Sequence, residues 1–131
     1  MNTHDRVMNP QALTSLYGDF PSFDGAELIG ANFRCDDPLL TAKFVTRDKP
    51  KASPKRWPDH YDEVIIELSF IGVSRLLLSN WGYKNPINRF ELKLVDDHAS
   101  VRISCGNEAS LEFLCDWIRI ESVAYGLVGT P

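Results

Sequence analysis

Residues 62–94 of the chain, DEVIIELSFIGVSRLLLSNWGYKNPINRFELKL, decide the fold that the sequence predicts. In the first part of this stretch, apolar side chains occupy alternate positions, at Val64, Ile66, Leu68 and Phe70. Successive side chains of a β-strand point to opposite faces of its sheet, so this alternation predicts a strand with one face on a core. The β-branched residues among them favour a strand over a helix.

Two further strands are expected in the same stretch. Gly72 lies where a turn is needed, and residues 75–81 predict a strand that returns as the second half of a hairpin. Residues 82–86 contain a glycine, an asparagine and a proline, which are typical of the next turn. Apolar and charged side chains alternate at residues 90–94, which predicts a third strand with one polar face.

A short helix is expected near the N-terminus, after residues 1–8, which we expect to be frayed. Asn9 is a favourable N-cap, Pro10 suits the first helical position, and Gly18 is typical of the residue that ends a helix. The apolar residues between them share one face, at Leu13, Leu16 and Tyr17. We expect this helix to close one end or edge of the sheet structure.

Strand signals recur along the rest of the chain. Alternating patterns predict a hairpin from residues 27–35 and 40–45, and further strands within residues 101–117. The two isoleucines that follow fall in the opposite phase, and we attribute this switch to a β-bulge near Trp117. The sequence therefore predicts a mainly β fold, an antiparallel sandwich or open curled barrel of about seven strands with one short N-terminal helix.

A resemblance to a known family rests on the order and spacing of several short motifs. They are Asp24-Gly25-Ala26, Pro54, Trp57, the run from Phe70 to Ser74, Trp81-Gly82, Leu111-Glu112-Phe113 and Trp117-Ile118. Together they run from about residue 20 to residue 126. This pattern resembles the bacterial immunity proteins of polymorphic toxin systems, in particular the immunity protein fifty family. The resemblance implies a mostly β protein that binds and neutralises a partner toxin, and it brings no catalytic residues.

Length and charge limit the classes of function. With 131 residues, the chain is expected to form a single domain over residues 1–131. A net charge of −4 and a pI of about 5.3 argue against nucleic-acid binding, which needs a basic face. No apolar run approaches the ~20 residues that span a bilayer, and the polar N-terminus lacks the apolar segment of a signal peptide. We therefore expect a cytoplasmic protein that binds neither nucleic acid nor membrane.

No arrangement of reactive side chains predicts catalysis. Three cysteines, Cys35, Cys105 and Cys115, show no CxxC spacing, and we expect them to be buried free thiols. The three histidines, His4, His60 and His98, form no HxH or HxxxH pair. Fingerprints of serine hydrolases, P-loop enzymes and dinucleotide-binding proteins are also absent from the sequence. We expect a protein that is not an enzyme and holds no metal or cofactor.

The composition changes clearly in one segment, residues 47–60, RDKPKASPKRWPDH. This segment is basic and Pro-rich, and it predicts a long, exposed, semi-rigid loop. Two interpretations are open. The loop is either a solvated insertion that protects a sheet edge, or an interaction loop with Trp57 as its anchor.

Two acidic turns, Asp36-Asp37 and Asp96-Asp97, suggest a way to recognise a basic partner. If they cluster at one end of the sheets, their charge would steer a basic toxin toward that end. Trp81 is expected to close the core, whereas Tyr83 is open to either a core or a partner-binding role. The candidate partner-binding residues are therefore Asp36, Asp37, Trp57, Tyr83, Asp96 and Asp97.

These observations favour a non-catalytic binding protein. The first hypothesis is an immunity protein that binds and neutralises a cognate bacterial toxin by occlusion. The alternative is a small-ligand-binding protein with a pocket inside a curled β-barrel. The sequence leaves the oligomeric state open.

Overall fold

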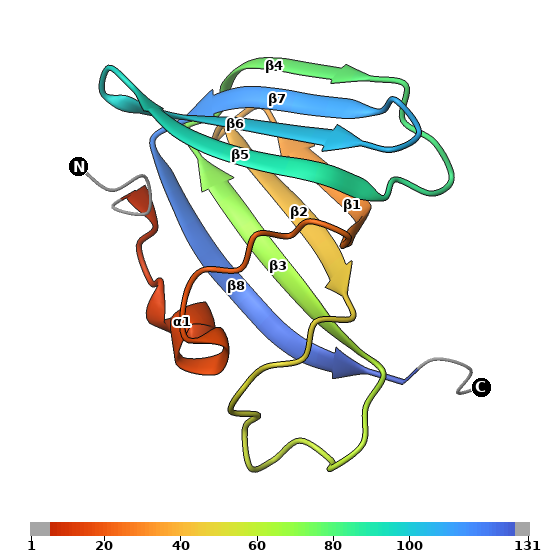
Figure 1. Cartoon of the computed structure of the whole chain (residues 1–131). Coiled ribbons are helices and arrows are strands. Elements are labelled where there is room, and N and C mark those ends of the chain that lie inside the picture. Colours follow the sequence, from red (N-terminus) through yellow and green to blue (C-terminus); the bar gives the residue numbers. More distant parts are fainter. Residues whose placement is uncertain (1–5, 128–131) are drawn as a thin grey trace.

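The computed structural model describes residues 6–127, which form eight β-strands and one short helix (Figure 1). Their bounds are α1 Gln11–Tyr17, β1 Glu27–Arg34, β2 Leu39–Thr46, β3 Glu63–Ile71, β4 Ser74–Ser79, β5 Ile87–Val95, β6 His98–Cys105, β7 Ser110–Cys115 and β8 Trp117–Gly126. They build two four-stranded antiparallel sheets, in the orders β1-β2-β3-β8 and β4-β7-β6-β5. The sheets stack as a sandwich and do not close into a barrel, so the predicted mainly β fold is confirmed in its sandwich form.

The core lies between the two sheets and is built from the alternating rows that the sequence predicted. In β3, Val64, Ile66, Leu68 and Phe70 are all fully buried. The facing sheet contributes a matching row, and the Phe70 and Phe113 rings meet edge to face with centroids 4.8 Å apart. Burial of such rows supplies most of the stabilisation of a sandwich, because each large apolar side chain removed from water contributes about 1.5–3 kcal/mol.

The predicted hairpin between β3 and β4 is wrong, although both strands exist. β3 pairs with β2 and β8, whereas β4 pairs with β7 in the other sheet. Gly72, with a φ of 74°, turns the chain from one sheet to the other. A β-carbon at this position would collide with the Asp116 carboxylate as it lies here, and the positive φ also favours glycine at the crossing. By contrast, the predicted hairpin from β1 to β2 is confirmed.

The phase switch near Trp117 also marks a change of sheet, and its attribution to a bulge is wrong. β7 ends at Cys115, the chain bends at Asp116, and β8 begins in the other sheet. Each of these strands keeps one buried row, but the two rows belong to different sheets. One predicted strand is therefore two, which raises the count from about seven to eight among the described residues.

The N-terminal segment covers the outer edge of β8. Residues 1–5 lie outside the described residues, but the expectation that residues 6–8 are frayed is wrong. Val7 is buried and forms a parallel bridge with Ile118, whose carbonyl accepts a hydrogen bond of 2.8 Å from the Met8 N–H. α1 follows and ends at Gly18, whose φ of 82° confirms the predicted terminus.

Asn9 was expected to cap α1, and this expectation is wrong. No side-chain hydrogen bond caps the helix, and Pro10 occupies the N-cap position. The Asn9 amide instead pairs with the backbone of Ile120 in β8, donating from Nδ2 at 2.9 Å and accepting at Oδ1 at 2.8 Å. The Asn9 side chain thus bonds both the N–H and the carbonyl of Ile120, as a neighbouring strand would. Asn9 therefore extends the protection of the β8 edge that Val7 and Met8 begin.

The segment between α1 and β1 fills one of the two open sides of the sandwich (Figure 1). It crosses between β8 and β5, and its Phe23 is buried with a φ of 63°. The Phe23 ring lies 4.9 Å from that of Phe44 and 5.1 Å from that of Phe90, so it bridges both sheets. No helix within residues 6–127 has the length and apolar character needed to cross a membrane.

We expect Phe23→Ala to lower the free energy of unfolding by about 3–5 kcal/mol, because it empties a site that both sheets contact. Urea unfolding followed by circular dichroism measures this change. Tyr83→Ala is the matched control, since that side chain is 98% exposed, and it should cost less than about 0.5 kcal/mol. Equal losses in the two variants would show that Phe23 does not join the sheets.

Candidate functional site

The two acidic turns lie at the same end of the sandwich. Asp36-Asp37 connects β1 to β2, and Asp96-Asp97 connects β5 to β6. A chain of contacts joins the two turns. The Gly72 N–H donates to the Pro38 carbonyl at 2.9 Å, the Asp116 N–H donates to the Ile71 carbonyl at 2.8 Å, and Asp116 Oδ1 lies 3.0 Å from His98 Nδ1. The four turn carboxylates are exposed at this end, which we call the acidic end.

Cations compensate only part of this charge. Arg34 lies 3.5 Å from Asp36, and both side chains are largely exposed. Arg6 places its guanidinium 5.1 Å from the centre of the Trp117 ring, also at this end. Within residues 6–127, Asp37, Asp96 and Asp97 form no ion pair. The acidic end therefore presents free carboxylates to solvent, which is the condition for long-range attraction of a cationic partner.

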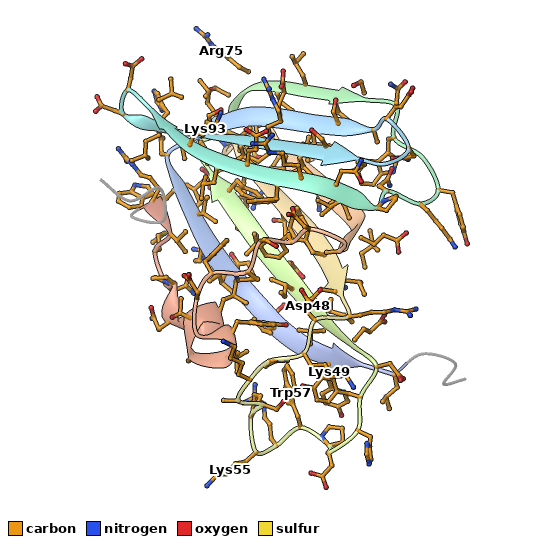
Figure 2. The ribbon with its side chains drawn as sticks, in the orientation of Figure 1. Asp48, Lys49, Lys55, Trp57, Arg75 and Lys93 are labelled. Carbon is orange, nitrogen blue, oxygen red and sulfur yellow. The ribbon has the colours of Figure 1, made fainter. Side chains whose placement is uncertain are left out.

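The basic loop is held against the helix. The Lys51 N–H donates to the Leu16 carbonyl at 2.8 Å, and the Tyr17 hydroxyl donates to the Asp48 carbonyl at 2.8 Å. Burial raises the pKa of Tyr17 to about 12, so this hydroxyl remains a donor at neutral pH. The charged residues of the loop are exposed around its outside, including Lys49 and Lys55 in Figure 2.

Trp57 lies inside this loop. Only 7% of its surface is exposed, and its ring packs against those of Tyr61 and Tyr125, with centroids 5.3 and 5.8 Å apart. Its indole fastens the loop to the end of β8, so in this structure it is not presented to a partner. A partner-binding role for Trp57 stays a prediction that requires the loop to open.

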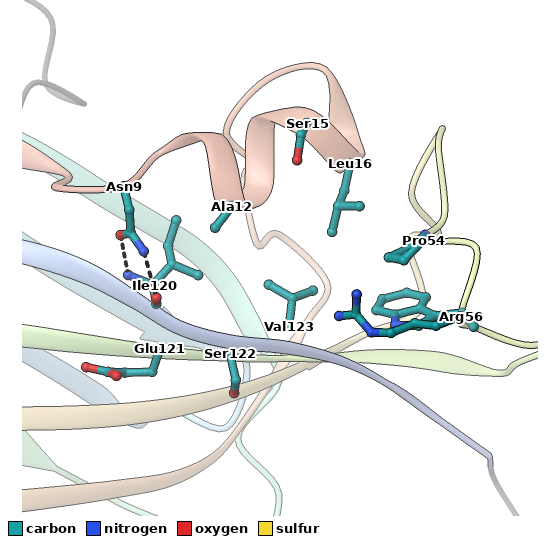
Figure 3. A pocket seen from close by; sticks show the side chains of 11 residues that line it. Asn9, Ala12, Ser15, Leu16, Pro54, Arg56, Ile120, Glu121, Ser122 and Val123 are labelled. Atoms are coloured by element: carbon teal, nitrogen blue, oxygen red, sulfur yellow. Dashed lines mark hydrogen bonds between the residues drawn. The ribbon is translucent and has the colours of Figure 1, made fainter.

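A cleft of about 430 Å³ lies at the surface between α1, the loop and β8 (Figure 3). Its walls mix apolar and polar groups, with Ala12 and Leu16 from the helix, Arg56 from the loop and Glu121 from β8. The alternative function required a pocket inside a curled β-barrel. The sheets are open at their sides, and buried side chains occupy the space between them, so this cleft is not such a pocket.

Within residues 6–127, no group of three or more His, Cys, Asp or Glu side chains is placed to hold a metal ion. Cys105 and Cys115 are buried as expected, but Cys35 is exposed, and the expectation that it is buried is wrong. It follows the end of β1 and lines an open cleft beside the start of β4. Burial raises the pKa of the Cys115 thiol to about 12, which leaves it protonated and unreactive at neutral pH.

The sequence missed an exposed apolar surface between the edge strands β1 and β4. Its members are Ile29 and Phe33 from β1, Leu76 and Leu78 from β4, and Trp81 from the following loop. We call this surface the β1/β4 seam, and clefts of about 330 and 310 Å³ lie along it. The expectation that Trp81 closes the core is wrong, since 41% of its surface is exposed. The signal that could have found the seam is the run of three leucines from Leu76 to Leu78, which lacks polar alternation.

Tyr83 lies beyond the seam in the loop between β4 and β5. Its side chain is 98% exposed, which leaves it free to contact another molecule. The described structure thus brings the acidic turns together at one end, and places Trp57 and Tyr83 elsewhere.

The family model described as Immunity protein 50 matches residues 9–126. No curated protein and no solved structure matches the chain.

The thiols give a direct test of the burial pattern. In the native protein, Ellman's reagent at pH 8 should modify Cys35 rapidly and leave Cys105 and Cys115 unmodified, because only Cys35 is exposed. In guanidinium chloride all three thiols should react. Cys35→Ser should remove the fast reaction, and a fast reaction that survives this substitution would contradict the described core.

Proposed function

This chain belongs to the Immunity protein 50 family, and from that membership we propose that it binds a cognate bacterial toxin and neutralises it without catalysis. The observation that carries the proposal is the family match over residues 9–126, nearly the whole chain. The toxin would come from a polymorphic toxin system, and the encounter would take place in the bacterial cytoplasm.

We propose occlusion as the mechanism. The body is a pair of stacked sheets with large buried side chains, and such a body keeps its shape when it binds. A specific complex buries roughly 800 Å² on each partner. This is about a tenth of the 7828 Å² surface of the protein, so one end of the sandwich is large enough to cover the working cleft of a small toxin domain.

The acidic end is the surface that we propose for the first encounter. Asp36, Asp37, Asp96 and Asp97 are exposed there, and three of the four have no ion-pair partner among the described residues. Complementary charge raises association rates by about 10- to 1,000-fold and contributes less to the lifetime of a complex. A toxin with a basic cleft would therefore be captured quickly.

Co-expression with the toxin encoded beside this chain tests the proposed function. Cells that produce the toxin domain alone should die, and cells that also produce this chain should survive and yield a complex that co-purifies at a one-to-one ratio. Persistent killing in the presence of soluble, folded chain would overturn the proposal.

Charge reversal tests the acidic end separately. Replacing Asp36, Asp37, Asp96 and Asp97 by lysine should slow association with the toxin at least tenfold at low salt, because attraction becomes repulsion. The matched control replaces four other exposed carboxylates by lysine, at Asp19, Asp24, Asp48 and Asp59. Both variants change the net charge equally, so an equal loss in the two would assign the effect to overall charge and remove the acidic end as a specific surface.

A further inference from the structure

The β1/β4 seam exposes side chains that point toward the core. Phe33 pairs with the fully buried Leu40 in β2, and Leu78 pairs with the buried Leu111 in β7. Directly paired residues of an antiparallel sheet point to the same face, so Phe33 and Leu78 both face the space between the sheets. They are nevertheless 40% and 42% exposed. On this side the described chain covers only the start of β1, where the Leu28 N–H donates to the Asn85 carbonyl at 3.0 Å, and it leaves Phe33 and Leu78 open.

The other side of the sandwich shows how such an opening is normally closed. There the chain itself crosses from α1 to β1 and inserts Phe23 between the sheets, while Val7, Met8 and Asn9 cover the edge of β8. On the β1/β4 side, the loop after β4 reaches only the start of β1, through bonds between Asn85 and Leu28, and no residue with the role of Phe23 is described there.

The edge strand β4 also lacks the protection of its counterpart. β5, at the opposite edge of the same sheet, carries Arg89, Glu91 and Lys93, which form ion pairs of 3.1 and 3.2 Å with one another. β4 has three leucines at its centre, and its only charged residue, Arg75, lies near its start. Edge strands usually carry charges that prevent pairing with other chains, so an edge without charges at its centre favours such pairing.

We propose that a second copy of this chain covers the seam. In this dimer, β4 pairs antiparallel with β4 of the other copy around a two-fold axis, and two four-stranded sheets become one sheet of eight strands. The inference does not depend on the proposed function.

The direction of the side chains selects the register. With Leu77 opposite its own copy, Leu76 faces Leu78 of the other copy on the core side. The two sandwiches then lie on the same side of the shared sheet, and the two seams meet. A shift by one residue would turn one sandwich over and leave both seams exposed, because successive side chains alternate between faces.

Charge supports the same arrangement. Arg75 lies near the start of β4, and Figure 2 shows it pointing away from the body into solvent. Glu108 lies beside the end of the strand, where its carbonyl accepts a hydrogen bond of 3.3 Å from Asn80. Neither charged group forms an ion pair within residues 6–127. The two-fold axis brings Arg75 of each copy toward Glu108 of the other, so the interface carries opposite charges at both ends.

A two-fold pairing also limits the assembly. Each copy uses its β4 edge once, so the dimer leaves no unpaired β4 to continue a filament. A closed pair therefore leaves the leucine-rich edge of neither copy open to a third chain.

Sedimentation velocity of the full chain over a range of concentrations tests the proposal. The mass should rise from 14.8 kDa to about twice that value. Leu77→Lys should raise the dimer dissociation constant at least tenfold, because it places two ammonium groups opposite each other at the axis. Val95→Lys is the matched control, since Val95 is an exposed apolar residue on β5, and it should leave the dimer intact.

Cross-linking tests the register and does not rely on a charged variant that still folds. In a Cys35→Ser background, a cysteine at position 77 should form a disulfide between copies on mild oxidation, because self-opposed residues have α-carbons within bonding range. Leu76→Cys, Leu78→Cys and Val95→Cys should cross-link at least fivefold more slowly.

Three results would overturn the proposal. They are a monomer at every concentration, a dimer that survives Leu77→Lys and cross-links no better at position 77, and a mass that grows beyond two copies. If the chain is a monomer and its Leu77→Lys variant also fails to protect cells, the seam would be a surface that binds the toxin.

Discussion

The structure depends on one point where the chain changes sheet twice. β3 leads into β4 at Gly72, and β7 leads into β8 at Asp116, and these are the two places where consecutive described strands belong to different sheets. The two crossings touch, because the Asp116 N–H donates to the Ile71 carbonyl at 2.8 Å and the Asp116 carboxylate occupies the space that a side chain at Gly72 would need. The acidic end is assembled around this point, since Asp116 also holds His98 beside the turn from β5 to β6.

Local patterns predicted the strands well, because the strand signal depends only on the alternation of apolar and polar side chains. The buried row of β3 and the hairpin from β1 to β2 are examples. Pairing is a different problem, since a glycine between two apolar runs is compatible with a hairpin or with a crossing between sheets. Asp116, which packs against Gly72 at the crossing, is 44 residues away from it in sequence. The wrong prediction for Asn9 has the same reason, because its partner Ile120 in β8 is 111 residues away in sequence.

For the candidate site residues too, local structure could be predicted and position in the fold could not. Aspartate pairs predicted turns, and the turns exist, but only the two sheets place both at one end. Trp81 is exposed where a core position was expected, and Trp57 is buried in a loop that was expected to be exposed, because tryptophan suits both a core and an exposed surface. Burial of Trp57 depends on the rings of Tyr61 and Tyr125, and exposure of Trp81 depends on the absence of a covering segment over the seam. Neither condition can be read from the neighbouring residues.

The place of β8 has a consequence for synthesis on the ribosome. It is the last described strand to be made, yet it lies between β3 and the N-terminal residues Val7 to Asn9. The first sheet therefore cannot be completed before residue 126 has been made, and until then the N-terminal segment has no β8 edge to pair with. Folding must begin with the nearby pairs, such as β1 with β2, and end with a long-range closure after translation has passed residue 126.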